Sequence, residues 1–230
     1  IRDRKERAAH VPLAYVLGRR EFMGLDFRVT RDTLIPRPDT EILVQCAVDF
    51  LHARLEAGAT ACTIADIGTG TGAIALSTLY YTEGTRADAV DISPAAAAVA
   101  RENAETLGLT ERIDIHVGDL LVPLAGRLYD MILSNPPYIP TADIAGLMPD
   151  VRSYEPHLAL DGGVDGLDIY RRLMAGAPAL LKEGGAVAVE VGIDEAAAVA
   201  ALALAHPRIV RTEMLKDLGG IERVVVGYTE

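Results

Sequence analysis

The stretch Asp66-Ile67-Gly68-Thr69-Gly70-Thr71-Gly72-Ala73 decides the fold of this chain, because three closely spaced glycines join a short apolar run to a helix-forming one. We predict a strand over Thr63–Ile67 and a helix over Ala73–Tyr80. Glycines let the backbone turn tightly and let a ligand approach the turn closely. The order of strand, Gly-rich loop and helix therefore predicts an α/β fold with a ligand site at residues 66–73.

This loop has three possible interpretations: two different ligands could bind to it, or it could be a turn that binds no ligand. It satisfies the dinucleotide fingerprint in its Gly/Ala-ending form, and Asp91 stands roughly 20 residues further on, where a ribose-binding acid belongs. A nicotinamide-dependent oxidoreductase is therefore one interpretation. Asp66 before the loop and the extra glycine at Gly72 favour S-adenosylmethionine, because an acidic strand end can help to bind the ammonium group of that ligand. A Gly-rich turn without a ligand is the third interpretation.

Strands and helices alternate after this loop. Further strands are predicted over Ala87–Ile92, Arg112–Val117, Tyr129–Ser134 and Gly185–Val191, and Ala-rich helices over Ala95–Ala100 and Ala196–Ala205. Such alternation predicts a parallel, doubly wound sheet. Arg208–Met214 and Ile221–Tyr228 differ, because no helical segment separates them, and they should pair antiparallel at one edge of the sheet.

The residues before Thr63 have another character. Glu21–Val29 predicts a hairpin that turns at Gly24, with Phe22 and Phe27 as apolar anchors. Leu34–Asp39 is a Pro-rich linker, and Asp39 or Thr40 should cap the helix that follows it. We therefore expect two domains, with residues 1–38 as an appendage with a β-hairpin linker and residues 39–230 as the α/β domain.

The composition excludes several classes of protein. No apolar run approaches the ~18 residues needed to span a bilayer, so we expect a cytoplasmic protein without a membrane segment. Cys46 and Cys62 have no neighbouring Cys or His at metal-ligand spacing, and we predict no metal site. The net charge is −11, although residues 1–37 contain nine Lys/Arg and five Asp/Glu. A protein or small-molecule substrate suits this acidic chain better than nucleic acid.

Acidic residues also follow the later strands. Asp91 ends the second strand of the predicted sheet, and a carboxylate there can accept hydrogen bonds from both ribose hydroxyls of a nucleoside. Asp119 ends the third strand and either accepts the adenine amino group or caps a turn. Leu120 either packs on the adenine ring, donates its backbone N–H to it, or belongs to the core.

A second loop, Asn135-Pro136-Pro137-Tyr138, follows the strand Tyr129–Ser134. Prolines stiffen a loop and remove backbone donors. A rigid loop aims the Asn135 side chain and the Pro136 carbonyl at one planar group with two N–H donors, such as a carboxamide or an exocyclic amine, and Tyr138 covers that group. The loop therefore predicts catalysis at a planar nitrogen, although a proline-rich turn of structural importance only is the alternative.

A third acidic cluster, Asp161, Asp165 and Asp168, lies among glycines and suggests calcium only weakly, because the spacing and the final Glu of an EF-hand loop are absent. A turn that caps a helix over Leu167–Ala177 explains these residues better.

Together these motifs resemble the class I S-adenosylmethionine-dependent methyltransferases, and more narrowly the HemK/PrmC family of protein-glutamine N5-methyltransferases. The narrower resemblance rests on segments outside the loop at 66–73. These are Pro12–Phe22, Leu34–Glu41, Tyr154–Gly163, Glu190–Gly192 and Lys216–Arg223. The resemblance implies a Rossmann-like fold with a seven-stranded, mostly parallel sheet and an antiparallel edge hairpin. It also implies a small helical domain before the hairpin, of which only Ile1–Ala9 would be the tail, so we expect a truncated chain.

The resemblance implies a function as well. The methyl group of S-adenosylmethionine would pass to the glutamine of the Gly-Gly-Gln motif in class-1 peptide chain release factors, with S-adenosylhomocysteine as the product. Residues 66 and 68–72, which include Thr69 and Thr71, would bind the cofactor together with Asp91, Asp119, Leu120 and Asn135. Residues 135–138 would bind the substrate, with Asn135, Pro136 and Tyr138 as the catalytic residues.

Other functions stay open at this point. A related ribosomal-protein glutamine methyltransferase and the adenine-N6 nucleic-acid methyltransferases share the tetrapeptide at 135–138. An adenine enzyme needs a basic target-recognition domain and a base-flipping pocket, and no segment here supplies the former. An oxidoreductase and a non-catalytic binding module remain as different classes. We expect a monomer.

Overall fold

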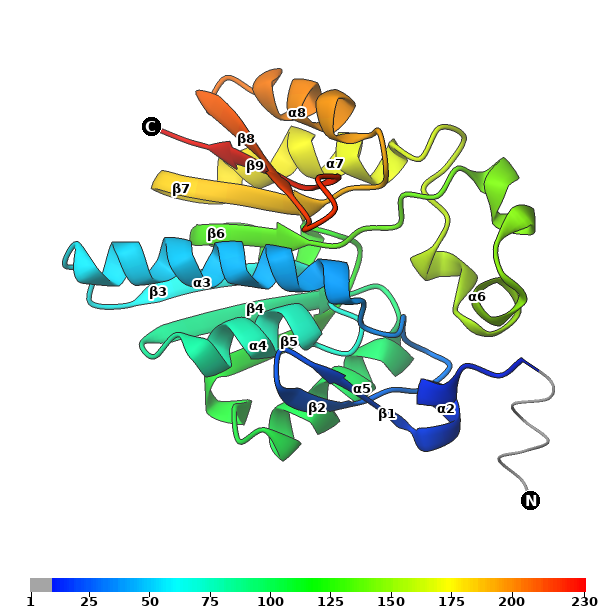
Figure 1. Cartoon of the computed structure of the whole chain (residues 1–230). Coiled ribbons are helices and arrows are strands. Elements are labelled where there is room, and N and C mark those ends of the chain that lie inside the picture. The colour runs from blue at the N-terminus through cyan, green and yellow to red at the C-terminus, as the bar shows by residue number, and fades with distance from the viewer. Residues whose placement is uncertain (1–9) are drawn as a thin grey trace.

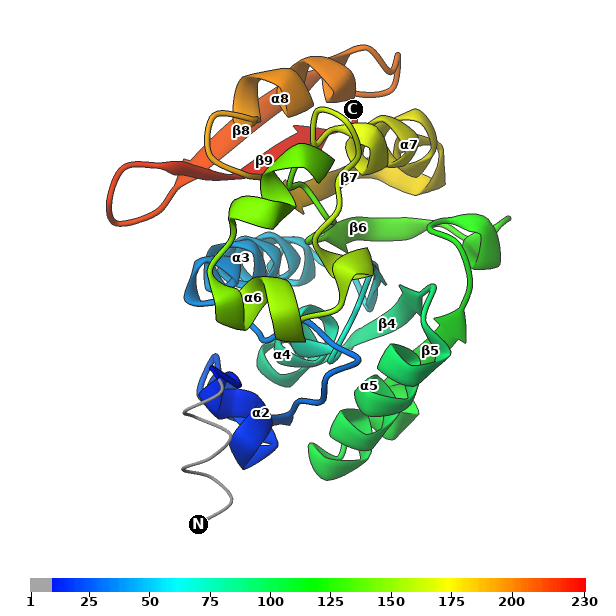
Figure 2. The ribbon, with the colours of Figure 1, turned by 90° about the vertical axis from the view of Figure 1, so that its right-hand side faces the viewer.

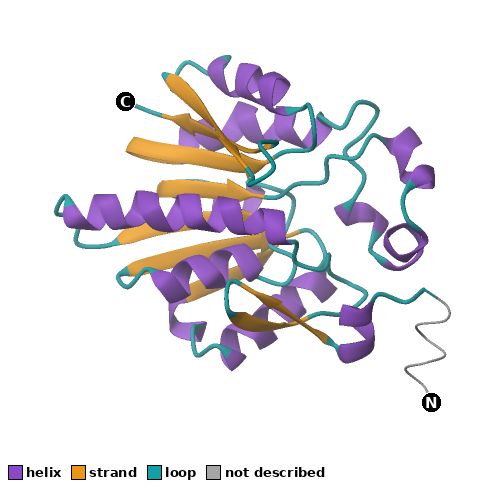
Figure 3. Ribbon diagram, viewed as in Figure 1, coloured by secondary structure: helices purple, strands orange, loops and turns teal. Residues whose placement is uncertain are grey.

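Seven strands form one large sheet in the order β5-β4-β3-β6-β7-β9-β8. The computed structural model describes residues 10–230 and shows this sheet between helices, with a two-stranded hairpin at one side (Figures 1 and 3). The strands are β3 (Cys62–Ile67), β4 (Thr85–Asp91), β5 (Ile113–Val117), β6 (Tyr129–Ser134), β7 (Leu181–Glu190), β8 (Arg211–Lys216) and β9 (Glu222–Tyr228).

Within this sheet, strands β3 to β7 run parallel, and β9 pairs antiparallel with both β7 and β8. The predicted sheet with an antiparallel hairpin at its edge is thus confirmed. Several boundaries differ from the predicted ones: β7 begins at Leu181 and not at Gly185, and β8 begins at Arg211 and not at Arg208. Ile209 closes a turn by donating its N–H to His206, and Arg208 donates to the carbonyl of Pro178 at 2.8 Å.

Helices cover both faces of the sheet. They are α3 (Glu41–Glu56), α4 (Ala73–Tyr81), α5 (Pro94–Thr106), α6 (Pro149–Tyr154), α7 (Asp168–Gly176) and α8 (Ala196–Leu204), preceded by the short α2 (Leu13–Leu17), which the sequence did not predict. Buried residues of α3 and α4 pack on one face, and those of α7 and α8 pack on the other. Because β3 to β7 run parallel, their carboxyl ends meet at one edge of the sheet.

The N-terminal caps predicted for two helices, α3 and α5, can be compared with the structure. Ser93 caps α5 by accepting a hydrogen bond from Ala96 N at 3.2 Å, and Pro94 occupies the first turn, as expected. The predicted cap of α3 is wrong, because neither Asp39 nor Thr40 makes a side-chain capping bond there and Pro38–Thr40 forms a 3₁₀ turn instead. The hydroxyl of Thr40 is directed into the site described below.

The predicted hairpin is formed by β1 (Arg19–Phe22) and β2 (Leu25–Arg28), with its turn at Met23 and Gly24. Phe22 and Phe27 are both buried, and their rings meet edge to face at a centroid distance of 6.2 Å. Both rings belong to the same apolar cluster as α3 and α4. The domain boundary between residues 38 and 39 stays a prediction, and the expected helical tail at 1–9 lies outside the described residues.

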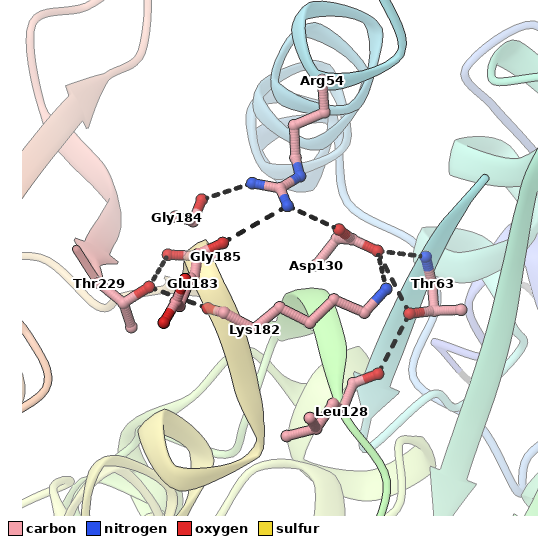
Figure 4. Close-up of polar contacts among 9 residues, drawn as sticks. All are labelled: Arg54, Thr63, Leu128, Asp130, Lys182, Glu183, Gly184, Gly185 and Thr229. Atoms are coloured by element: carbon pink, nitrogen blue, oxygen red, sulfur yellow. Dashed lines mark hydrogen bonds and ion pairs between the residues drawn. The ribbon is translucent and has the colours of Figure 1, made fainter. Parts of the chain in front are cut away.

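The amino ends of β3, β6 and β7 meet around one buried carboxylate (Figure 4). Asp130 Oδ2 accepts hydrogen bonds from Lys182 Nζ and from Thr63 N, each at 2.7 Å, and Oδ1 pairs with Arg54 of α3 at 3.0 Å. Arg54 also donates to the carbonyl of Gly184 at 2.8 Å. We call this network the Asp130 brace. It fastens the C-terminal end of α3 to three strands.

Two expectations about absent features concern the described residues only. Among residues 10–230, no helix combines the length and the apolar character that crossing a membrane requires. In the same part of the chain, no group of His, Cys, Asp and Glu is arranged to hold a metal ion. Asp165 instead accepts hydrogen bonds from Leu167 N and from Arg171.

Candidate active site

A cavity of about 380 Å³ opens at the carboxyl ends of the parallel strands. Figure 2 shows α6 in front of this edge of the sheet. Five groups of residues line most of it: the loop after β3, the ends of β4 to β6, the linker before α3, the segment that follows α6, and one side of α7. The lining includes Arg31–Leu34, Pro36, Arg37, Thr40, Ile67–Thr71, Ala73, Asp91–Ser93, Gly118–Leu120, Ser134–Pro137, Pro156, Leu158, Ala159 and Arg172.

The Gly-rich loop holds its shape through positive backbone angles. Gly70 has φ of +56° and Gly72 has φ of +81°, conformations that favour glycine. A Cβ atom on Gly72 would lie 2.8 Å from the Leu76 side chain, whereas one on Gly70 would meet nothing within 4 Å. Gly70 also lines the cavity. The loop thus leaves open space beside Gly70.

Asp66 stabilises this loop through hydrogen bonds to residues on both sides of Gly72. Its side chain is fully buried, and Oδ2 accepts hydrogen bonds from Thr69 Oγ1 at 2.6 Å and from Ala75 N at 3.2 Å. Oδ1 has no hydrogen-bond partner among the described residues. Burial raises the pKa of Asp66 to about 7, against the lowering effect of both hydrogen bonds. Asp66 is not among the residues that line the cavity, so its predicted contact with a ligand stays a prediction.

Asp91 lines the cavity at the end of β4. Its Oδ2 accepts a hydrogen bond from Gly70 N at 2.8 Å, and its Oδ1 accepts one from Ser93 N at 2.9 Å. Burial raises the pKa of this carboxyl, and the backbone hydrogen bonds oppose that effect. The carboxylate therefore lies next to the loop with lone pairs left for a ligand.

Asp119 and Leu120 line the cavity at the end of β5. Asp119 is half exposed, and its Oδ2 accepts a hydrogen bond at 2.6 Å from Arg172 of α7, which also lines the cavity. Leu120 has φ of +48°, an uncommon conformation for a residue with a side chain. The structure thus brings both predicted residues to the cavity and adds Arg172, which the sequence did not single out.

Asn135 lies at the end of β6 and takes part in a polar chain of three side chains. Its Nδ2 donates a hydrogen bond to Thr40 Oγ1 at 3.2 Å. Hydrogen bonding from Thr40 and Asn135 also reaches the carboxylate of Glu190 at the end of β7. Burial nevertheless raises the pKa of Glu190 to about 7, because this side chain is only 3% exposed.

Sequence reasoning assigned Glu190 no role and considered Thr40 only as a possible helix cap. Glu190 interrupts an otherwise apolar run, Ala186–Val191, and a lone acid near the end of a buried strand was a usable signal. The contact between residues 40, 135 and 190 depends on the order of strands in the sheet, and no local pattern encodes that order.

The rest of the tetrapeptide is braced by a second chain segment. Ile139 N donates to Leu160 O at 3.0 Å, and Gly162 N donates to Ile139 O at 2.9 Å. A Cβ atom on Gly162 would lie 2.7 Å from the Cα atom of Tyr138, so only glycine allows this approach. Pro136 and Pro137 line the cavity, but Tyr138 packs against the core and is not among the lining residues.

The two segments that cover the cavity are joined through Glu155. Its side chain is almost fully buried, and Oε2 accepts a hydrogen bond from Ile35 N at 3.2 Å. Oε1 pairs with Arg37. We call these contacts the Glu155 latch. They tie the linker before α3 to the end of α6.

Comparisons with known proteins define the class of this fold. The family model described as "methyltransferase small domain" matches residues 43–146. The crystal structure of the N-terminal domain of human METTL16 in complex with SAH has a TM-score of 0.64, with 17% sequence identity, and the match covers 98% of this chain and 82% of that one. The fold is therefore the α/β architecture of the class I methyltransferases, and the predicted fold class is confirmed.

Sequence relatives narrow this class. The release factor glutamine methyltransferase of Moorella thermoacetica is 50% identical over 222 residues, which cover 96% of this chain and 76% of the relative. The protein of the same name from Cereibacter sphaeroides is 45% identical over 219 residues, with coverages of 95% and 75%. This chain belongs to the family of release factor glutamine methyltransferases, which confirms the resemblance seen in the sequence.

Proposed function

We propose that this chain transfers the methyl group of S-adenosylmethionine to the side-chain amide nitrogen of the glutamine in the Gly-Gly-Gln motif of class-1 peptide chain release factors. One observation carries the proposal. A single cavity is lined on one side by the Gly-rich loop and Asp91, and on the other by Asn135 and Pro136. A cofactor and a planar amide would thus meet in one space. The names of the relatives support this choice of substrate.

The cavity and the residues around it fit the cofactor. The cavity volume of about 380 Å³ lies within the usual range for small-molecule sites. Asp91 would accept hydrogen bonds from the ribose hydroxyls, and Asp119 and Leu120 would contact the adenine. Gly68, Thr69, Gly70, Thr71 and Gly72 would surround the rest of the molecule. Asp66 Oδ1, which has no hydrogen-bond partner within residues 10–230, would suit a cationic group. When bound, the cofactor supplies an electrophilic methyl group.

The tetrapeptide would bind the substrate amide. Asn135 Oδ1 and the Pro136 carbonyl would accept its two N–H bonds, while Pro137 stiffens the loop. An amide nitrogen is a poor nucleophile because its lone pair is delocalised, so the residues act mainly by positioning it. The two acceptors also stabilise the positive charge that develops on this nitrogen. Tyr138 would cover the amide only after its ring has moved from the core.

The proposal extends to partners and location. Release factors are the expected protein partners, and the net charge of −11 opposes direct binding of nucleic acid. We further propose a cytoplasmic monomer, in which residues 39–230 carry the chemistry and the hairpin within residues 1–38 contributes to substrate contact.

Mass spectrometry of a release factor incubated with this protein and S-adenosylmethionine tests the function. We expect a gain of one methyl group on the Gly-Gly-Gln glutamine, and none on a release factor whose motif glutamine is replaced by Glu. Methylation of a ribosomal protein or of adenine in DNA instead would overturn the proposed substrate. Calorimetry with S-adenosylhomocysteine and with NAD tests the cofactor, and we expect heat of binding from the former alone.

A further inference from the structure

Glu190 is a buried acid that the proposed reaction does not yet use. Its side chain is 3% exposed, and Oε2 has no hydrogen-bond partner among the described residues. An unsatisfied carboxylate oxygen in such a place costs free energy, so stability alone does not explain it. The other contacts of this carboxylate are with Thr40 and Asn135. Glu190 does not line the cavity itself, so any role in the site must pass through Asn135 and Thr40, which do.

The three side chains form a directed chain of hydrogen bonds in which Asn135, as well as Thr40, also hydrogen-bonds to Glu190. A carboxylate only accepts, so the Thr40 hydroxyl must donate its proton to Glu190. The lone pairs of Thr40 Oγ1 then remain for Asn135 Nδ2, which lies 3.2 Å away. The nitrogen of the Asn135 amide is thereby fixed toward Thr40, and its oxygen points the other way.

We propose that Glu190 is a positioning residue that acts on Asn135 both directly and through Thr40 to hold the Asn135 amide oxygen toward the substrate nitrogen. This inference rests on the proposed function insofar as Asn135 is the acceptor of the substrate amide. A proton on Glu190 reverses the chain, because the acid then donates to Thr40 and the hydroxyl proton turns toward Asn135. The amide rotates in response, and its NH₂ group faces the substrate NH₂ group, which offers only donors.

The groups around Glu190 come from four elements. They are Asp39 before α3, Arg223 of β9, Tyr138 after β6 and Tyr170 of α7. Asp39 and Arg223 pair with each other at 3.2 Å. Burial raises the pKa of Tyr138 to about 12 and that of Tyr170 well above its usual value. Neither tyrosine changes charge near neutral pH, whereas Glu190 does.

The orientation of Asn135 is tested first, by NMR on the full chain without substrate. The side-chain NH₂ resonances of Asn135, identified by their loss in Asn135→Asp, should shift with a midpoint near pH 7. The shift should vanish in Glu190→Gln and persist in Asp66→Asn, because Asp66 also has a pKa of about 7. Resonances that titrate alike in Glu190→Gln and in wild type would overturn the inference.

Kinetics supply the second readout. With cofactor and release factor both saturating, kcat of the wild type should fall as pH drops through about 7. In Glu190→Gln this limb should be lost and kcat at pH 8 should be about tenfold lower or more, the scale at which groups that orient a reactive side chain act. Cofactor affinity should be unchanged, and the matched control Glu183→Gln, exposed on the same strand, should behave as wild type.

The outcomes separate this inference from the proposed function. If the wild type methylates a release factor and Glu190→Gln has the same kcat and pH profile, the positioning role is wrong and the function stands. If the wild type does not methylate it, the proposed function is wrong, and the Asn135 resonances still decide whether Glu190 orients that amide.

Discussion

The two ends of the parallel strands hold buried carboxylates under opposite conditions. At the amino end, Asp130 has partners on both oxygens. Burial alone would raise its pKa, but the hydrogen bonds from Lys182 and Thr63 and the charges of Lys182 and Arg54 lower it. At the carboxyl end, Asp66 and Glu190 each keep one oxygen without a partner among the described residues, and burial raises both pKa values to about 7.

This difference distinguishes stability from function within one sheet. A buried charge with complete partners holds elements together, and the Asp130 brace joins α3 to three strands. Incomplete partners and raised pKa values concentrate where a protein binds and reacts with other molecules. The contrast therefore predicts which substitutions affect turnover and which affect only the free energy of unfolding.

The largest expected effect is on turnover at the carboxyl end. Asn135→Ala should reduce the single-turnover rate of methyl transfer about 100- to 1000-fold, or ~2.7–4 kcal/mol, because it removes a preorganised acceptor that acts in the transition state. Affinity for S-adenosylhomocysteine, measured by calorimetry, should be retained. Asn135→Asp keeps the shape and adds a charge, so it should orient the amide less well without loss of cofactor. A near-normal rate in Asn135→Ala would make the tetrapeptide a structural turn.

At the amino end, the effect should fall on stability alone. Asp130→Ala should lower the free energy of unfolding by about 3 kcal/mol, the lower end for a broken buried ion pair, because Arg54 and Lys182 are partly exposed and regain water. Urea denaturation measures this change, with the exposed Asp114→Ala as control. Turnover per folded molecule should equal that of the wild type. A selective loss of turnover would remove the distinction between the two ends.

A smaller effect is expected on cofactor binding. Asp91→Ala should weaken binding of S-adenosylhomocysteine by roughly 1.5–3 kcal/mol, the usual contribution of hydrogen bonds to a charged group. Calorimetry on the folded variant measures the change. Asp88→Ala is the matched control, since Asp88 lies on the same strand but contacts His116, Arg127 and Tyr129 and does not line the cavity. Equal affinities in both variants would place Asp91 outside the binding site.

The smallest effect concerns the slope of stability with pH. Asp66 and Glu190 titrate near pH 4 in the unfolded chain and near 7 in the fold. Between these values the folded state binds more protons, so the free energy of unfolding should fall as pH rises, by about 1 kcal/mol per pH unit for each group. Asp130, with its lowered pKa, should lose its contribution only as pH falls below about 4.

Substitutions show which carboxyl group causes the pH dependence of the free energy of unfolding. Urea denaturation between pH 5 and 7 should show a flatter dependence in Asp66→Asn and an unchanged one in Asp130→Asn. The same flattening in both variants would contradict the contrast between the two ends of the sheet.

Much of this architecture could be predicted from the sequence because its signals are local. The apolar run before Gly68, the Ser93-Pro94 cap and the anchors of the hairpin each depend on a few adjacent residues. The start of β8 was misplaced because Arg208 is held by the carbonyl of Pro178, a contact between distant segments. The short helix α6 was not predicted, because six residues carry too little periodicity to distinguish a helix from a loop.

The residues of the candidate site also fall into those that the sequence predicted and those that it did not. Asp91, Asp119 and Asn135 were predicted because the carboxyl ends of parallel strands converge at one edge. The roles of Thr40 and Glu190 were missed because the two residues are 150 positions apart in sequence and meet only through the strand order. The direction of the Asp66 side chain, toward Thr69 and Ala75, depends on the backbone geometry of the loop, which residue types alone do not determine.

The Glu155 latch has a consequence for the order in which the protein is made. Ile35 and Glu155 are separated by 120 positions, and the cavity is also lined by Leu158, Ala159 and Arg172. A nascent chain that has emerged only as far as the tetrapeptide contains the Gly-rich loop but lacks the segment that covers the cavity. Ligand capture therefore becomes complete late in synthesis, only after the segment from Glu155 to Arg172 has left the ribosome.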